Sequence, residues 1–165
     1  MPNTKSKAQV MHPKKLQDSV TELSIIARPE DANTIGTVFG GRIMYWMDMA
    51  AAVCARRHSN LRVVTAGVDG MQFLAPLKVG QVIKLLAHVN RAFASSMEIE
   101  VNVFGEDTYR ATQFLAAKAF FNIVVFDEQD RPAQVPEFIP QGHEEKQRWE
   151  QAGGRKEQRD REKVN

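Results

Sequence analysis

Apolar residues between positions 41 and 58 recur at the spacing of one helix face. An α-helix turns ~100° per residue, so residues three, four and seven positions apart share a side. The apolar stripe formed in this way contains Ile43, Trp46, Met47, Ala50, Ala51 and Cys54. Gly40 and Gly41 precede the stripe, and Arg56 and Arg57 stand where basic side chains favour a helix C-terminus. The pattern predicts a long helix over about residues 41–58.

Beyond this helix the apolar positions follow the period of a strand. Residues 83–89 and 97–103 each alternate apolar and polar side chains, which is typical of strands with one buried face, and they are spaced as a hairpin. Residues 115–126 are apolar on both faces and predict a central strand. Residues 20–27 and 63–74 add a first strand and a long mixed strand. About five long antiparallel strands with one long helix predict an α+β layer, in which the sheet wraps the helix.

The composition suits one compact domain, since 43% of the 165 residues are hydrophobic. We expect a disordered leader over residues 1–15, a folded domain over 16–140, and a charged tail over 141–165 that is helical or disordered. The net charge of +2 is uneven, because the leader holds four lysines and no acid. Residues 16–141 hold 11 basic and 14 acidic side chains, and this slightly acidic body argues against nucleic-acid binding by the fold.

A single cysteine, Cys54, cannot form an internal disulfide. Its place on the apolar stripe predicts a buried, reduced thiol, as expected in the cytoplasm. The N-terminus is polar, and no apolar run approaches the ~20 residues needed to cross a bilayer. We therefore expect a soluble, cytoplasmic protein with no membrane partner.

Asp48 is an acidic residue at the edge of the apolar stripe. It stands two turns after Gly41, too deep in the helix to be an N-cap, and no basic residue lies three or four positions away. A half-buried, unpaired acid is costly unless a cleft solvates it or chemistry uses it. Gly40 and Gly41 expose the unpartnered N–H groups of the helix start, which favour a developing oxyanion. These donors and the carboxylate could polarise a carbonyl and direct a water at it.

Simpler interpretations stand beside this one. Gly40 and Gly41 could merely turn the chain, and Asp48 could bond a neighbouring backbone amide. Ser95 and Ser96 lack a histidine or a G-x-S-x-G context, so a turn role or a phosphate contact is expected rather than a catalytic triad.

Other polar residues predict no further chemistry. Glu98 and Glu100 share one strand face, which we interpret as solvated or facing another subunit. Four histidines are scattered without the spacing of metal ligands, so we expect surface or helix-cap residues and no metal site. These are His12, His58, His88 and His143.

Nine short motifs lie over roughly residues 16–140, in the same order as in one known protein family. They are residues 29–33 (PEDAN), 36–41 (GTVFGG), 47–48 (MD), 55–58 (ARRH), 63–65 (VVT), 73–76 (FLAP), 79–80 (VG), 95–98 (SSME) and 135–136 (VP). Each is weak alone, but together they closely resemble the hotdog-fold cytosolic acyl-CoA thioester hydrolases, the group of brain-type acyl-CoA hydrolase and small bacterial acyl-CoA thioesterases. The chain departs from the family pattern at Gly67 and Gly70, where at least one side chain is expected, and in its charged tail.

The resemblance implies a hotdog fold and assigns roles residue by residue. Asp48 matches the catalytic acid, and Asn33 matches an asparagine that meets it from the opposite subunit of a dimer. Gly41 matches the backbone that polarises the thioester carbonyl. The resemblance also implies substrate or CoA contacts at Gly40, Thr65, Arg91, Ser95 and Ser96.

The function implied is hydrolysis of acyl-CoA to free fatty acid and CoA. No cofactor is expected, because CoA enters as part of the substrate, and the assembly implied is a homodimer that forms a trimer of dimers. Two alternatives remain. A hotdog hydratase or dehydratase would need a histidine near the helix start, and residues 36–48 contain none. The other is a non-catalytic acyl-CoA-binding or regulatory hotdog protein. A regulator would carry a DNA-binding module, yet the leader is too short for a helix-turn-helix.

Overall fold

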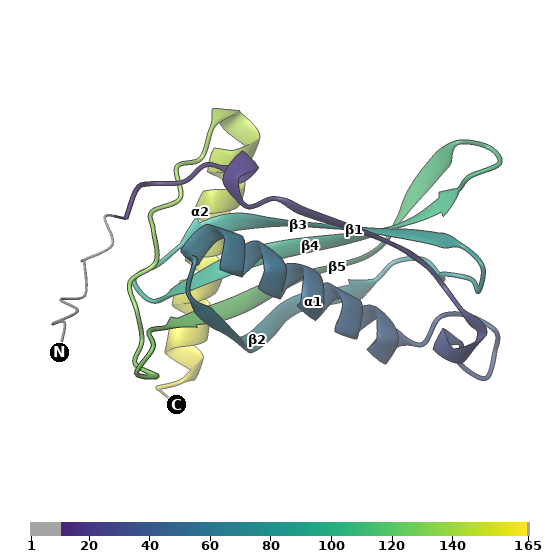
Figure 1. The fold of residues 1–165 in the computed structure, drawn as a ribbon, viewed down its shortest axis with the longest axis horizontal. Helices are drawn as coiled ribbons and strands as arrows, with labels where there is room; N and C mark the ends of the chain where they lie inside the picture. Colours follow the sequence, from purple (N-terminus) through teal and green to yellow (C-terminus); the bar gives the residue numbers. More distant parts are fainter. Residues whose placement is uncertain (1–10, 165) are drawn as a thin grey trace, which may run out of the picture.

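The computed structural model describes residues 11–164, so residues 1–10 of the predicted leader lie outside the described part of the chain. Its elements in chain order are η1 (Leu16–Asp18), β1 (Thr21–Ile26), η2 (Pro29–Asp31), α1 (Gly40–Ser59), β2 (Arg62–Phe73), β3 (Val82–Ala92), β4 (Ser96–Asp107), β5 (Thr112–Phe126) and α2 (Gly142–Glu162), where η marks a short 3-10 helix (Figure 1). The helix and the five strands predicted from hydrophobic periodicity are confirmed.

The strands form one antiparallel sheet in the order β1-β3-β4-β5-β2. β3 and β4 pair as the predicted hairpin, with Leu85 opposite Val103. β5 lies between β4 and β2, which explains why its residues are apolar on both faces. β2 is an edge strand, and register shifts interrupt its pairing with β5 on either side of Gly67. The long edge of β2 is therefore open to another chain.

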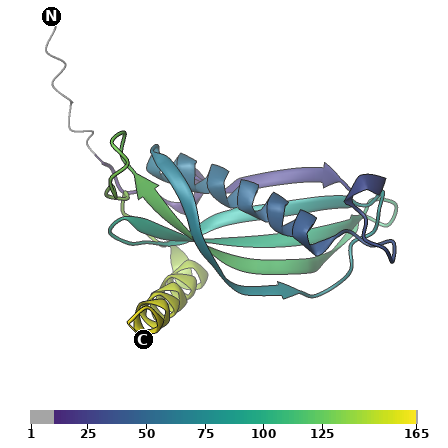
Figure 2. The same ribbon diagram turned by 90° about the horizontal axis from the view of Figure 1, so that it is seen from below.

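α1 lies along the inner face of the curled sheet, and Figure 2 shows the strands bending around it. The predicted apolar stripe is the buried face: Met47, Ala50, Ala51 and Cys54 are fully covered. The small alanines let the helix approach the strands closely. The helix ends where Asn60 takes a left-handed conformation with φ of 56°, and its amide donates to the Arg56 carbonyl. The chain then reverses at once into β2.

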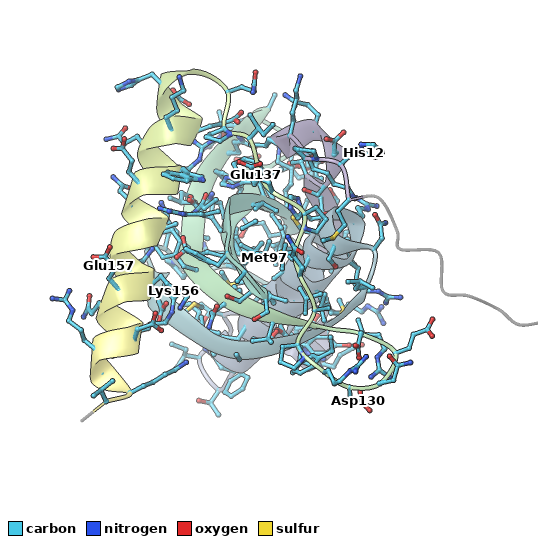
Figure 3. All side chains as sticks on the ribbon, turned by 90° about the vertical axis from the view of Figure 1, so that its left-hand side faces the viewer. His12, Met97, Asp130, Glu137, Lys156 and Glu157 are labelled. Atoms are coloured by element: carbon cyan, nitrogen blue, oxygen red, sulfur yellow. The ribbon has the colours of Figure 1, made fainter. Side chains whose placement is uncertain are left out.

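α2 packs on the outer face of the sheet, opposite α1 (Figure 2). Arg155 donates from Nε and Nη2 to the two carboxylate oxygens of Glu98, at 3.0 and 2.7 Å. Glu98 is fully buried and Glu100 nearly so. The interpretation of these two acids as a solvated or subunit-facing surface is therefore wrong, because Arg155 of α2 pairs with Glu98 and Lys118 of β5 pairs with Glu100 within the same chain. In Figure 3, Glu157 lies on the side of α2 that faces away from the strands.

Two of the four histidines are also buried: His58 lies in the last turn of α1, as expected of a cap residue but without exposure, whereas His88 lies within β3, contrary to the expectation of a surface or cap position. His58 Nε2 lies 2.8 Å from the Pro136 carbonyl, and His88 lies on the outer face of the sheet opposite Glu100. Burial lowers the pKa of both imidazoles. Among residues 11–164, no group of three or more potential ligand side chains could hold a metal ion. Neither helix in that range is long and apolar enough to span a membrane.

Candidate active site

Asp48 projects from the exposed side of α1 toward the edge strand. Its Oδ1 accepts a hydrogen bond from Thr65 Oγ1 at 2.6 Å, so the first residues of β2 hold the carboxylate in place. The sharp turn at Asn60 makes this contact possible, since it runs β2 back alongside the helix. Asp48 is exposed in the single chain rather than half-buried as predicted. A hydroxyl donor on one oxygen leaves the other free to act on a ligand.

The start of α1 presents two unoccupied backbone donors. The N-cap residue, Phe39, makes no capping hydrogen bond, and within residues 11–164 the amides of Gly40 and Gly41 have no acceptor. A Cβ at Gly40 would lie 3.3 Å from Phe73 Cζ, and a Cβ at Gly41 would lie 2.6 Å from Phe39 Cε1. Glycine at both positions therefore lets the rings of Phe73 and Phe39 lie close to the helix start. The geometry suits a carbonyl oxygen that gains negative charge.

Gly41 and Asp48 do not face one site within a single chain. Seven residues separate them on a continuous helix, which at 1.5 Å per residue is about 10 Å along the axis. A thioester carbonyl needs its oxygen donor and its attacking group each at about 3 Å. The idea that these donors and this carboxylate serve one carbonyl is therefore wrong for a single chain. It requires two copies that bring the helix start of one to the middle of the other.

Asn33 organises the loop that leads into the helix start. Its Oδ1 accepts from the amides of Ile35 and Thr37 at 3.0 and 3.1 Å, and its Nδ2 donates to Thr37 Oγ1 at 2.8 Å. The same loop is tied down where the Phe39 amide donates to the Asp31 carbonyl. One Nδ2 proton of Asn33 is left for another partner. The structure joins Asn33 to the loop before Gly40 and not to Asp48 of the same chain.

Arg91 lies away from Asp48, on the outer face of the sheet. Its guanidinium stacks on the Trp149 ring at 3.5 Å and donates to the Trp149 carbonyl at 3.4 Å. Gly153 makes room for it, because a Cβ there would clash with Arg91 Nη1. Ser95 precedes β4 and Ser96 is its first residue, in the turn after β3. Within one chain these three residues are not gathered around the carboxylate. Trp149, the lone aromatic of the charged tail, was the available sign that the tail docks.

Two grooves open beside the helix start. One has a volume of about 300 Å³ and a mainly apolar lining that includes Gly40, Ile43 and Phe73. The other has a volume of about 480 Å³ and includes Gly41, Arg42 and Tyr45. Arg42 Nε lies 2.9 Å from the buried Asp31 carboxylate, so this second groove is polar. The two exposed amides thus stand between an apolar and a polar groove.

A larger hollow of about 810 Å³ lies at the opposite end of α1, between Arg56 and Phe126. It contains neither Asp48 nor the two glycines. Size alone does not make it the reaction site, because the groups that could act on a carbonyl lie elsewhere.

Cys54 is a buried thiol, as predicted. Burial raises its pKa to about 12, which keeps it protonated at neutral pH. It has no part in the candidate chemistry.

Comparisons with known proteins identify the family. A family model described as the thioesterase superfamily matches residues 35–112. An uncharacterized acyl-CoA thioester hydrolase of Zymomonas mobilis is 37% identical over 114 residues, covering 69% of this chain and 76% of that protein. The cytosolic acyl coenzyme A thioester hydrolase of Rattus norvegicus is 34% identical over 145 residues, covering 87% of this chain. The chain spans only 38% of the rat protein's length.

The fold agrees with the sequence match. An acyl-CoA hydrolase from Staphylococcus aureus, solved with butyryl coenzyme A, superposes with a TM-score of 0.86 at 32% identity, covering 92% of each chain. The antiparallel sheet around one long helix is thus the hotdog fold that the resemblance implied. These matches place the chain in the thioesterase superfamily, as a member of the acyl-CoA thioester hydrolase family.

Proposed function

We propose that this protein hydrolyses acyl-CoA to a free fatty acid and CoA, at a site shared between two copies of the chain. The observation that carries the proposal is the exposed Asp48 carboxylate, which Thr65 holds in place on the open side of α1. Two unoccupied amides at Gly40 and Gly41 complement it as donors for the thioester oxygen.

The Staphylococcus aureus enzyme supports this choice of residues. Structures of that enzyme have been solved with an aspartate, a threonine or an asparagine each replaced by alanine. The three replaced residues follow one another as asparagine, aspartate and threonine, 15 and then 17 residues apart. Asn33, Asp48 and Thr65 have the same order and the same spacings. We infer that these three residues act together in this chain.

The open edge of β2 supplies the means to bring two copies together. Its residues leave apolar side chains uncovered, and Val64 is 56% exposed. Antiparallel pairing of β2 with its own copy would place two α1 helices side by side in opposite directions. The Gly41 amide and Asn33 of one copy then lie near Asp48 and Thr65 of the other. Hexameric thioesterases are among the structural matches, one from Yersinia pestis at 35% identity, and we propose a trimer of dimers here.

In the proposed reaction, Asp48 acts as general base or as nucleophile. As a base it takes a proton from water while the water oxygen bonds to the thioester carbon. The carbon–sulfur bond then breaks, and the sulfur takes the electron pair and a proton to become the CoA thiol. As a nucleophile its carboxylate oxygen bonds to the carbonyl carbon and expels the thiolate, and water hydrolyses the resulting anhydride. Either route develops negative charge on the oxygen beside the Gly41 amide.

The proposed chemistry uses only side chains, backbone amides and water, with CoA entering as part of the substrate. CoA is bound in structures of the Staphylococcus aureus enzyme. The mammalian relatives are named cytosolic, and we propose the cytoplasm as the place of action.

Release of free thiol from acyl-CoA tests the proposal directly. Purified protein incubated with butyryl-CoA and a thiol reagent should release CoA well above the uncatalysed rate. Binding of acyl-CoA without thiol release, over a series of chain lengths, would instead identify a non-catalytic acyl-CoA-binding protein.

A further inference from the structure

We propose that the apolar groove beside Gly40 receives the acyl chain, and that Phe73 sets the chain-length preference of the enzyme. This inference rests on the proposed acyl-CoA hydrolysis and assigns one arm of the substrate to one groove. It follows from three features of the helix start: the polarity of the two grooves, the state of their hydrogen-bonding groups, and the position of one aromatic ring.

The acyl-CoA substrate has an apolar acyl arm and a polar CoA arm, and the side chains of the two grooves differ in polarity in the same way. The groove beside Gly40 is lined by the side chains of Val38, Ile43, Phe73, Leu74, Pro76 and Leu77, with Thr37 as its polar residue. The groove beside Gly41 contains the ionised pair of Arg42 and Asp31. A hydrocarbon chain gains more free energy on burial in the first, because its side chains are apolar and the second places charged groups beside the chain.

Apart from the Gly40 amide, which is proposed to hold the carbonyl oxygen, several polar groups of the apolar groove are already paired. Thr37 Oγ1 accepts from Asn33, and the Val38 amide donates to the Leu77 carbonyl at 2.8 Å. The amides of Leu74 and Ala75 both donate to the Ala116 carbonyl, at 2.7 and 3.2 Å. The pantetheine arm of CoA carries two amides and a hydroxyl, which would lose their hydrogen bonds to water here without replacement. The acyl arm carries no such groups.

Phe73 lines this groove next to Gly40. Its ring edge approaches Gly40, with Cζ, Cε1 and Cε2 at 3.3, 3.7 and 3.8 Å from the position of a Cβ there. The ring is therefore beside the amides proposed to hold the carbonyl oxygen, where the first carbons of an acyl chain would pass. In the single chain it is 53% exposed, so its removal costs little packing within that chain. The groove's volume of about 300 Å³ is at the low end for ligand pockets, ~300–1,000 Å³.

The test compares acyl-CoA substrates of increasing chain length, from acetyl-CoA to palmitoyl-CoA. Phe73→Ala should raise kcat/KM for long chains relative to butyryl-CoA by ~10-fold or more, the low end of the discrimination that one methylene provides in an apolar pocket. Phe73→Trp should shift the preference in the opposite direction, toward shorter chains. The two variants act oppositely on specificity, which simple damage to the fold would not do.

The matched control is Phe104→Ala, which removes the same ring from a half-buried position near Lys84, outside the groove lining. It should leave the chain-length profile unchanged. If Phe73→Ala and Phe73→Trp leave the profile of an active enzyme unchanged, or lower all chain lengths in parallel, the assignment of the acyl groove is wrong. If the wild-type protein hydrolyses none of the acyl-CoAs, the proposed function itself fails.

Discussion

The hydroxyl of Thr65 donates to Asp48 Oδ1 over 2.6 Å and thereby links the edge strand β2 to the middle of α1. The acid therefore belongs to the open edge of the sheet and not to the core. A carboxylate placed there is available to a ligand and to a second chain at the same time.

Replacing Asp48 with alanine should abolish most of the thioesterase activity. We expect turnover to fall by at least ~10²-fold, the low end of what a positioned acid or base contributes. Because Asp48 is exposed and outside the core, the melting temperature should change little. Glu157→Ala is the matched control, since it removes an exposed carboxylate from a helix that does not reach the site. Near wild-type turnover of folded Asp48→Ala would remove the residue from the mechanism.

Thr65→Val should lower kcat without preventing substrate binding. A hydrogen bond to a charged group is worth about 1.5–3 kcal/mol, which corresponds to roughly 10- to 100-fold in rate if it orients Asp48 for the reaction. Thr65→Ser keeps the hydroxyl and should recover most of the rate. Steady-state kinetics on both variants separates the two effects, because a substrate contact would raise KM and leave kcat unchanged.

Gly41→Val tests the backbone donors at the helix start. A side chain there meets the Phe39 ring, which is 59% exposed and can turn aside, so the fold should tolerate the change. The branched side chain would nevertheless cover the amide, and kcat should fall by ~10-fold or more. Gly154→Val, at an open glycine in α2, is the control. Parallel loss of thermal stability and activity would mean that Gly41 serves only the turn.

The positions and buried faces of the strands and the course of α1 follow from hydrophobic periodicity, because each has a face that must be buried. The contact of Thr65 with Asp48 did not follow, since it depends on how closely β2 returns along the helix after Asn60. The distance between Gly41 and Asp48 along the helix can be predicted from the sequence alone. Seven residues at 1.5 Å rise already exclude a common ligand within one chain.

The packing of α2 on the sheet does not follow from the sequence pattern. Its sequence is strongly charged, and such helices usually stay in solvent, yet Arg155 and Trp149 turn inward onto Glu98 and Arg91. The pairing of Glu98 could not be seen in the sequence because its partner Arg155 comes 57 residues later in the chain, and that of Glu100 depends on Lys118 of the neighbouring strand β5. Periodicity within one strand cannot show which distant helix covers its polar face.

The ion pair under α2 should be costly to break. Glu98 is fully buried, so Arg155→Met leaves a charge without its main partner, and we expect the free energy of unfolding to fall by about 3 kcal/mol. Replacing both partners, as in Arg155→Met with Glu98→Leu, should recover much of this loss. Arg161→Met, on the exposed side of α2, should change it by less than about 0.5 kcal/mol. Urea denaturation measures all three, and equal stability of the two single variants would contradict the pairing.

A shared active site predicts that two inactive variants restore each other. Asn33→Ala and Asp48→Ala subunits should each be inactive alone, because every site in either homodimer lacks one residue. Random exchange of equal amounts gives half of the dimers mixed, and each mixed dimer holds one intact site of two. About a quarter of the wild-type activity should therefore return, if the sites act independently.

Mass spectrometry establishes that exchange has occurred, and Asp48→Ala mixed with Thr65→Val is the control. Asp48 and Thr65 touch within one chain, so an intact pair needs both residues from the same copy. In a mixed dimer each copy lacks one of the two, and activity should therefore not return. Complete exchange of Asn33→Ala with Asp48→Ala and no recovered activity would place both residues in sites formed by one chain, and the pairing of two copies through β2 would lose its catalytic role.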